Sequence, residues 1–434
     1  MTAELSWFHP SKRPYRFTIL VFVSLLTYGS YFAYDSVGAI APTLLKVLDV
    51  PRSAIGTMYT LYSVAAIVSV FLGGILIDKI GTRAASTIFA LLVAVGAAVV
   101  ALAPSIFVVY VGRFIFGAGS EALVVAQSAI LARWFKGKEL ALSFGIALTI
   151  SRLGTLFSFN TEELIAKYFG NYKAALWAAV ILCAVSLAAA LVYWALDRHG
   201  AHALELEDAG AEDKVVLSDI KKFPASFWYV AILCVTFYSA IFPFTALSTD
   251  FFHDKWKIPL TVGEGGGFLY QVFYNIIHMF STAGGTTTII IAASMFLAPF
   301  AGQLVDKIGK RGSLMIFGSI LMVPSFLVMA FTMIQPRYPM MLLGAAFVLV
   351  PAAMWPAVPL IVRKELVGSA FGLITMIQNI GLALFPYLNG KLRDVTHTYT
   401  ASMLMFASLG FVGLIFAFLL KRADAREGGV LERS

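Results

Sequence analysis

Charged residues are scarce in this chain. Only 13% of its 434 residues are charged, whereas 59% are hydrophobic. A soluble domain carries about 25% charged residues, so this composition cannot supply a water-facing surface for a globule of this size. Apolar runs of about 20 residues recur along the chain, and a lipid bilayer is the solvent that suits them. The sequence therefore predicts an all-α integral membrane protein.

Several chemical motifs are also missing. Both cysteines, Cys183 and Cys234, fall inside apolar runs, which favours buried thiols over a disulfide. The six histidines show no metal-ligand spacing, and the sequence has no Walker loop and no nucleophile elbow. We therefore expect no enzyme activity, no cofactor, no metal and no direct use of ATP. The net charge of +8 is divided among short clusters between apolar runs, so we expect no nucleic-acid partner.

Twelve apolar runs are long enough to cross a bilayer. They lie near 16–42, 53–77, 84–103, 106–132, 139–161, 173–196, 225–250, 283–304, 313–333, 339–361, 367–389 and 399–420. A polar segment separates the first six from the last six. We therefore expect an N-terminal six-helix half at 1–196, a cytoplasmic linker at 197–222 and a C-terminal six-helix half at 223–434.

The segment 254–282 is longer than a tight loop between two spans. Its part from Phe268 to Ser281 is predicted to form an extra amphipathic helix at the membrane interface. The alternative is that the eighth span begins early and is simply long.

The positions of Lys and Arg predict the topology. Most of them fall in segments that are cytoplasmic if both termini lie inside the cell. Lys12, Arg13 and Arg16 precede a first apolar run that is too long for a signal peptide, so we expect no cleaved signal. The sequence has no N-glycosylation sequon, and its tails have no acidic dileucine-type sorting signal. These features favour a bacterial inner membrane, where we expect a lipid-embedded monomer.

One motif occurs twice, about half a chain length apart. Residues 73–83 read GGILIDKIGTR and residues 301–311 read AGQLVDKIGKR. Both resemble the signature cytoplasmic loop of the major facilitator superfamily. The resemblance implies a fold of 12 transmembrane helices in two pseudo-symmetric halves. It also implies conformational or gating roles for Asp78, Arg83, Asp306 and Arg311, whose charges would latch the cytoplasmic side.

Four charged residues lie inside predicted spans, where a charge is costly and marks a candidate functional site. Asp35 shares a helix stripe with Tyr31. The stripe fits either a cavity lining or an aromatic packing face with an acid near the outer boundary. Arg113 resembles an Arg-x-x-x-Gly element of the superfamily, which implies either a functional role in proton coupling or gating, or helix packing. Glu121 and Arg152 fit either a salt bridge between helices or a clamp for a zwitterion, with Glu121 on an ammonium and Arg152 on a carboxylate.

Polar and aromatic residues of the second half could complete such a site. Tyr238 lies in the seventh span, Trp355 in the tenth, and Gln378 and Asn379 in the eleventh. Trp355 stands among prolines at 351, 356 and 359, a pattern that predicts a distorted helix. Aligning the repeats at 138–145 and 364–372 places Asn379 opposite Arg152, at the depth where such folds keep their substrate.

The intramembrane motifs resemble one branch of the superfamily, the lysosomal dipeptide uniporters. The matching stretches include GSEALVVAQ at 119–127, SRLG at 151–154, MWP at 354–356 and IQNIGL at 377–382. The resemblance implies alternating-access transport of dipeptides, with Glu121 at the amino end and Arg152 at the carboxyl end. Two alternatives stay open: an organic-anion or sugar-phosphate carrier that uses Arg113 and Arg152, and a non-transporting receptor or scaffold. The sequence leaves open the exact substrate, the direction of transport, and uniport against proton coupling.

Overall fold

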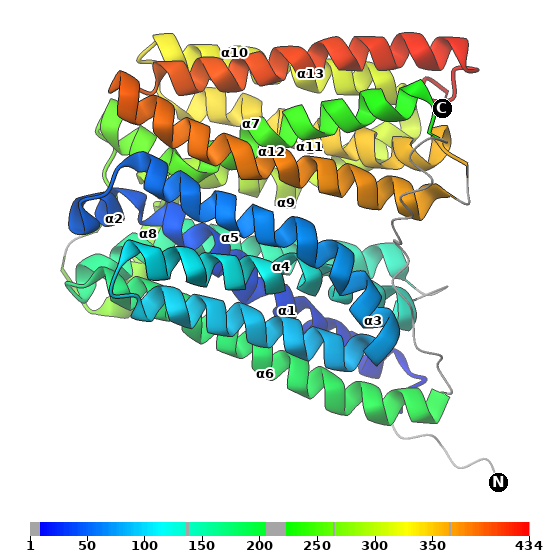
Figure 1. Ribbon diagram of the computed structural model, residues 1–434, viewed down its shortest axis with the longest axis horizontal. Helices are drawn as coiled ribbons and strands as arrows, with labels where there is room; N and C mark the ends of the chain where they lie inside the picture. Colours follow the sequence, from blue (N-terminus) through cyan, green and yellow to red (C-terminus); the bar gives the residue numbers. More distant parts are fainter. Residues whose placement is uncertain (1–8, 136–138, 205–222, 264, 364–365, 434) are drawn as a thin grey trace. The chain divides into compact units, whose positions relative to one another are not determined.

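The computed structural model describes residues 9–135, 139–204, 223–263, 265–363 and 366–433, and this part of the chain is helical with no strand (Figure 1). The N-terminal half supplies α1 (Arg13–Ala39), α2 (Ala41–Leu48), α3 (Arg52–Leu102), α4 (Ile106–Phe135), α5 (Leu140–Tyr168) and α6 (Tyr172–Leu204). The C-terminal half supplies α7 (Ala225–Trp256), α8 (Phe268–Ile277), α9 (Ala283–Ile308), α10 (Arg311–Phe331), α11 (Arg337–Ile361), α12 (Val367–Thr396) and α13 (Thr400–Arg426).

The predicted set of twelve spans is confirmed. Within the described ranges, eleven helices are long and apolar enough to cross a membrane. One of them, α3, has 51 residues and would be about 76 Å long if straight, far more than the bilayer core of about 30 Å. It breaks at Gly81, whose φ of 77° and ψ of 164° are not helical and suit a residue without a side chain. This break divides α3 into two spans.

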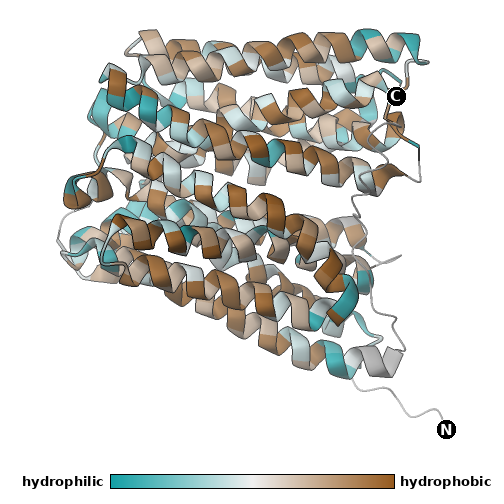
Figure 2. Cartoon of the chain, in the orientation of Figure 1, coloured by the Kyte–Doolittle hydropathy of each residue, from teal (hydrophilic) through white to brown (hydrophobic). Residues whose placement is uncertain are grey.

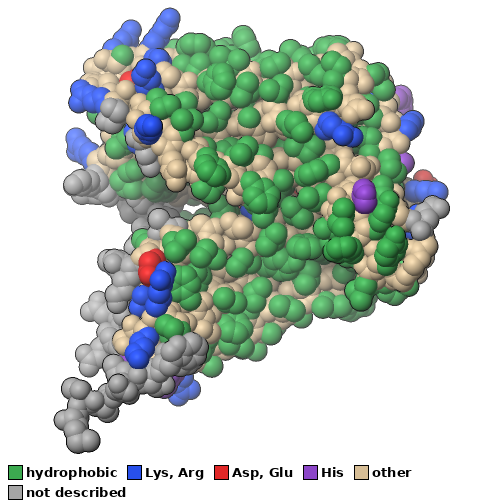
Figure 3. Space-filling model, turned by 180° about the vertical axis from the view of Figure 1, so that it is seen from behind, with side chains coloured by type: hydrophobic (Ala, Val, Ile, Leu, Met, Phe, Trp, Pro, Cys, Tyr) green, Lys and Arg blue, Asp and Glu red, His purple; other side chains and the backbone are tan. Residues whose placement is uncertain are grey.

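Hydrophobic side chains cover the flanks of the helices. Figure 2 shows hydrophobic residues along the helix lengths and hydrophilic residues mostly near the helix ends. On the face in Figure 3, hydrophobic side chains dominate the surface, and Lys and Arg side chains gather near the ends. Large side chains such as Phe107, Phe296 and Phe300 are about 70% exposed. A bilayer is the environment that covers such a surface, and the chain is an integral membrane protein.

The structure divides into two compact units. Unit 1 holds residues 1–34, 65–155 and 176–212, and unit 2 holds residues 35–64, 156–175 and 213–434. Unit 2 therefore contains the end of α1, all of α2, the beginning of α3, the end of α5 and the first residues of α6, together with the C-terminal half. Helix α6 continues to Leu204, and residues 205–222 of the predicted linker lie outside the described residues. The division of the chain at 197–222 stays a prediction.

The segment 254–282 contains a separate short helix. Helix α8 is followed by a 3₁₀ turn at Met279–Ser281 before α9 begins. The hydroxyl of Thr282 accepts a hydrogen bond from the amide of Gly285 (2.9 Å) and caps α9. Helix α8 is thus distinct from α9, as the first of the two alternatives predicts. Its place at a membrane interface stays a prediction.

Candidate functional site

Arg152 of unit 1 lies over an aromatic ring of α1. Its guanidinium carbon is 5.6 Å from the centre of the Tyr31 ring, a cation–π distance. The two helices approach closely here because Gly154 has no side chain: a Cβ at this position would lie 2.4 Å from the carbonyl oxygen of Tyr28. Both Arg152 and Tyr31 are half-buried. The structure therefore brings together two of the predicted site residues.

Glu121 is held on α4 beside a contact between two serines. The neighbouring residue, Ser120, has its hydroxyl oxygen 2.6 Å from that of Ser30 on α1. Both serines are buried, whereas Glu121 itself is half-buried. This contact fixes the rotation of α4 against α1 and so fixes the direction of Glu121.

A second set of polar contacts joins three helices of unit 1. The side-chain amide of Gln127 on α4 donates to the carbonyl of Val23 (2.9 Å) and to the hydroxyl of Thr27 (3.0 Å), both on α1. The hydroxyl oxygen of Thr27 in turn lies 2.6 Å from that of Ser151, the residue before Arg152 on α5. These buried hydrogen bonds position α4 and α5 against the same helix, and with them Glu121 and Arg152.

Arg113 is buried and bound to backbone. Its guanidinium donates to the carbonyls of Ala33 (3.2 Å) and Tyr34 (3.3 Å) on α1. It also lies over the rings of Tyr34 and Phe116, at 5.6 and 5.3 Å from their centres. Of the two roles that the sequence left open for Arg113, these contacts favour helix packing.

In unit 2 the predicted aromatic residues form a cluster. The indole nitrogen of Trp355 on α11 donates to the hydroxyl of Tyr238 on α7 (3.0 Å). Tyr238 also stacks on Phe242, with ring centres 5.7 Å apart and planes within 5°. Helix α11 runs without interruption through the prolines at 351, 356 and 359. The structure thus joins Tyr238 and Trp355.

Three further predicted residues are also in unit 2. On α12, Gln378 accepts a long hydrogen bond from the Cys234 thiol (3.6 Å). Asn379 donates to the Thr375 carbonyl (3.0 Å), while its own amide oxygen is buried without a described hydrogen-bond partner. A buried amide oxygen without a partner, as in Asn379, is unusual, and a polar substrate group is one way to satisfy it. Asp35, the third of these residues, is buried near the end of α1.

The first copy of the repeated motif belongs to a charge cluster in unit 1. Asp78 is exposed just before the break at Gly81. Arg83 pairs with Asp197 at the end of α6 (2.9 Å). Asp197 is fully buried and also accepts hydrogen bonds from Arg133 (3.0 Å) and the Trp134 indole (2.6 Å). The sequence places Asp197 at the first position of the linker. The sequence did not predict that this carboxylate would accept hydrogen bonds or ion pairs from Arg83, Arg133 and Trp134.

The second copy of the motif forms the turn between α9 and α10. Its Gly309 and Lys310 have φ angles of 67° and 42°, and the amide of Arg311 donates to the carbonyl of Leu431 in the C-terminal tail (2.7 Å). The side chain of Asp306 lies outside what the structure describes. The gating roles of Asp306 and Arg311 therefore stay predictions.

A charged cluster that the sequence did not predict lies at one end of unit 2. We call this end, where α3 begins and α7 and α12 end, the distal end; under the predicted topology it faces away from the cytoplasm. Arg52 pairs with Asp250 on α7 (2.6 Å), and the Tyr399 hydroxyl donates to the same carboxylate. Burial and the Asp250 charge raise the pKa of Tyr399 well above its ordinary value, so the hydroxyl keeps its proton.

Two more ion contacts extend this cluster. The carboxylate of Asp394 on α12 accepts the backbone amides of Arg52 (2.8 Å) and Ser53 (2.9 Å) at the start of α3, where it satisfies unpaired amides and the helix dipole. Arg393 pairs with Asp254 on α7 (2.8 Å). We call the set Arg52, Asp250, Asp254, Arg393, Asp394 and Tyr399 the distal clasp.

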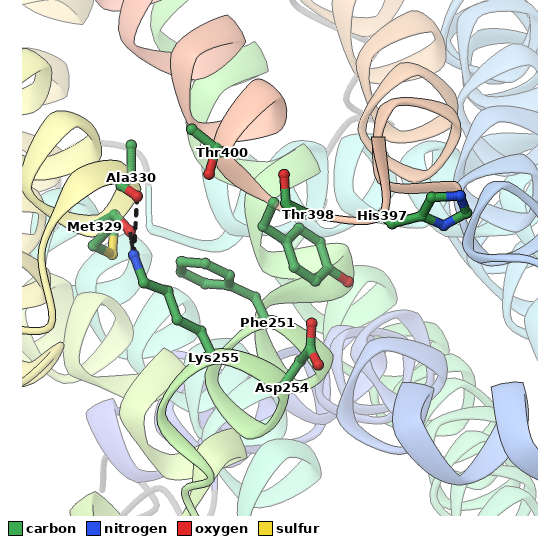
Figure 4. A pocket seen from close by; sticks show the side chains of 9 residues that line it. Phe251, Asp254, Lys255, Met329, Ala330, His397, Thr398 and Thr400 are labelled. Atoms are coloured by element: carbon green, nitrogen blue, oxygen red, sulfur yellow. Dashed lines mark hydrogen bonds between the residues drawn. The ribbon is translucent and has the colours of Figure 1, made fainter. Parts of the chain in front are cut away.

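The distal clasp joins backbones as well as side chains. A Cβ on Gly56 of α3 would lie 2.2 Å from the Pro386 carbonyl oxygen of α12, and a Cβ on Gly390 would lie 2.4 Å from that of Arg52. A cavity of about 240 Å³ is lined in part by Asp254 and Tyr399 of the distal clasp. Figure 4 shows Lys255 in it, aimed at the carbonyls of Met329 and Ala330 that end α10. The distal end of unit 2 is therefore closed by segments from both halves of the sequence.

Known proteins support the same architecture. The model of the Major Facilitator Superfamily matches residues 20–277 and 267–433. The lysosomal dipeptide transporter MFSD1 of Danio rerio is 32% identical over 437 residues, which cover 97% of this chain and 90% of that protein. MFSD1 of Homo sapiens is 31% identical over 443 residues, covering 98% and 90%. Among solved structures, the nucleoside transporter NupG superimposes with a TM-score of 0.70 at 14% identity, covering 93% of this chain and 99% of NupG.

These matches extend over nearly the whole chain, and they agree with the repeated motif, the twelve spans and the absence of strand from the described residues. The chain belongs to the major facilitator superfamily of membrane transporters.

Proposed function

We propose that this transporter carries dipeptides or similar small zwitterions by alternating access. The observation that carries the proposal is the placement of Glu121 and Arg152. They are half-buried charges of opposite sign on two helices of unit 1 that are both bonded to α1. A charge inside a membrane helix is costly and is kept where it binds or couples something.

The chemistry of the two side chains suits the two ends of a peptide. The guanidinium of Arg152 offers a planar fork of donors that matches a carboxylate. The carboxylate of Glu121 accepts hydrogen bonds from an ammonium. The termini of an extended dipeptide are about 7 Å apart, a span suited to side chains on separate helices. The aromatic and amide residues Tyr238, Trp355, Gln378 and Asn379 are proposed as further substrate contacts.

The relatives favour this substrate class over organic anions. MFSD1 is named a dipeptide transporter, and its match covers 97–98% of this chain. An anion carrier would use Arg113 together with Arg152, but the guanidinium of Arg113 donates to two backbone carbonyls.

Alternating access assigns a role to both ends of the molecule. The distal clasp holds segments from both halves of the sequence, so it has to break before the distal end can open. We propose that the clasp is the distal gate, and that Asp78, Arg83, Asp306 and Arg311 act at the opposite, cytoplasmic end. We further propose that the protein lies as a monomer in a bacterial inner membrane with both termini in the cytoplasm.

Counterflow in proteoliposomes tests the proposed function. Vesicles loaded with an unlabelled dipeptide are expected to accumulate the same labelled dipeptide, and an excess of external dipeptide should abolish this uptake. Free amino acids carry both charged groups at a shorter separation, and hexuronates carry a carboxylate but no ammonium. Both are therefore expected to compete weakly. Equal competition by hexuronate would favour the anion carrier, and ligand binding without counterflow would favour the receptor.

A further inference from the structure

Two adjacent carboxyl groups are buried inside α5. Glu162 is 0% exposed and Glu163 is 8% exposed. They lie six and five residues before the end of the helix at Tyr168, which places them about 9 and about 7.5 Å inside it. The predicted fifth span ends at residue 161, just before the two acids. The structure shows instead that the helix continues and buries both.

Hydrogen bonding leaves this pair largely unsatisfied. The hydroxyl of Thr43 on α2 donates to one oxygen of Glu163 (2.8 Å). The other oxygen of Glu163 and both oxygens of Glu162 are buried without a hydrogen-bond partner among the described residues. The hydroxyl of Ser158, one turn earlier on the same helix face as Glu162, is buried in the same condition. Among the described residues, Thr43 is thus the one residue that donates to these two acid side chains.

The elements around the pair come from both halves of the sequence. A Cβ on Gly284, at the start of α9, would lie 2.2 Å from the carbonyl oxygen of Phe159. The side chain of Asn160 reaches Thr288 on α9 (3.4 Å), and its carbonyl accepts from the buried Asn275 of α8. Helix α5 is therefore pressed against C-terminal elements at the depth of the two acids.

The charged groups on the surrounding elements are engaged elsewhere or exposed. On α7, Asp250 and Asp254 belong to the distal clasp, and Lys255 donates to the end of α10. Exposed groups stand at the surface of the same elements: Lys46 and Asp49 at the end of α2, Lys167 on α5 and His278 after α8. Asp35 on α1 is another buried acid of unit 2. None of the basic groups forms a described ion pair with Glu162 or Glu163.

An ionised carboxylate in such a place would lack both water and a counter-ion. Burial without a compensating donor or cation disfavours the charged form, and a second carboxylate next to it disfavours that form further. A protonated, neutral carboxyl group is the form that such a site accommodates without a counter-ion.

We propose that the Glu162–Glu163 pair is a proton-binding site that locks the distal end closed. When α5 parts from α9, water reaches Glu162, its O–H bond breaks, and the proton passes to water on the distal side. A group that is neutral when buried and ionises when hydrated ties proton binding to closure by linkage. Low pH on the distal side thus favours the closed state, and rising pH favours the open one. The inference rests on alternating access but not on the choice of substrate.

Spin-label distances measure this switch without any substrate. In a C183A/C234A background, labels at V47C on α2 and V395C on α12 report on the distal end; both positions are more than half exposed. We expect the wild-type background to shift toward longer distances as pH rises. E162Q and the double variant E162Q/E163Q carry permanently neutral side chains, so they are expected to keep the short distance at every pH.

The exposed Glu427 at the end of α13 provides the matched control, and E427Q should keep the pH response of the background. Infrared spectroscopy gives a second readout: the carbonyl band of a protonated carboxyl group should be lost at high pH and reduced in E162Q. The proposal is overturned if the distances in the wild-type background do not respond to pH, or if E162Q/E163Q retains the full response. If the protein shows no dipeptide counterflow, the proposed substrate is wrong, but the spin-label distances and the infrared band still test the proton-binding site because neither uses a substrate.

Discussion

Arg152→Ala is expected to lower the apparent affinity for a dipeptide by roughly 10- to 100-fold. Hydrogen bonds to a charged group contribute about 1.5–3 kcal/mol, and each 1.4 kcal/mol corresponds to about a factor of ten. Arg152→Lys keeps the charge but loses the planar fork, so we expect an intermediate loss. The concentration dependence of counterflow measures both effects.

Glu121→Gln should produce a loss of similar size for an unmodified dipeptide. It should produce little further loss for a dipeptide whose amino group is acetylated, because that substrate has no ammonium to bind. Ser128→Ala is the matched control, since Ser128 lies on the same helix as Glu121 and donates only to the Val124 carbonyl (3.0 Å). Unchanged affinity in both Arg152→Ala and Glu121→Gln would contradict the assignment of these residues to the substrate.

Asp250→Ala is expected to open the distal clasp. The substitution leaves Arg52 and Tyr399 without the carboxylate that both contact. Breaking a buried pair costs about 3–5 kcal/mol. Because Arg52 is about a quarter exposed, we expect the lower end of that range, which would shift the balance of closed and open states by about 100-fold. Spin labels at V47C and V395C should report a longer distance, and counterflow should slow as the cycle stalls in the open state.

The control variant and the compensating double variant for Asp250→Ala both change residues at the distal end. Asp49, which follows α2, is exposed, and Asp49→Ala should leave the distance and the transport rate unchanged. The charge exchange Arg52→Asp with Asp250→Arg should recover part of the short distance, because it restores an ion pair with the opposite orientation. If Asp250→Ala transports at the normal rate with an unaltered distance, the clasp is not a gate.

The apolar runs predicted the helices closely, because a bilayer imposes length and hydrophobicity on every span. The predicted run 225–250 corresponds to α7, which ends at Trp256, and 367–389 corresponds to α12, which ends at Thr396. The repeated motif predicted the superfamily, which the comparisons confirm. The cation–π contact of Arg152 with Tyr31 and the hydrogen bond of Trp355 to Tyr238 join residues that the sequence had singled out.

The remaining features depend on contacts between distant segments, which hydropathy alone does not contain. Arg393 and Asp394 lie beyond the apolar part of the eleventh run, and a hydropathy reading assigns them to a loop. In the structure the helix continues through them, and their charges are paired across α3 and α7. Glu162 and Glu163 were missed for the same reason. The available signal was a pair of acids at the end of a span, followed by residues that could still form one more helical turn.

A thermal-shift measurement on the purified protein tests the central claim most directly. A ligand that binds the folded state stabilises it by about 2.7 kcal/mol at a concentration of 100 times its Kd. The unmodified dipeptide is therefore expected to raise the unfolding midpoint clearly. The same dipeptide with an acetylated amino end, or with an amidated carboxyl end, should raise it little, because each has lost the partner of Glu121 or Arg152. Equal shifts by all three peptides, or a shift by organic anions and none by the dipeptide, would contradict the account.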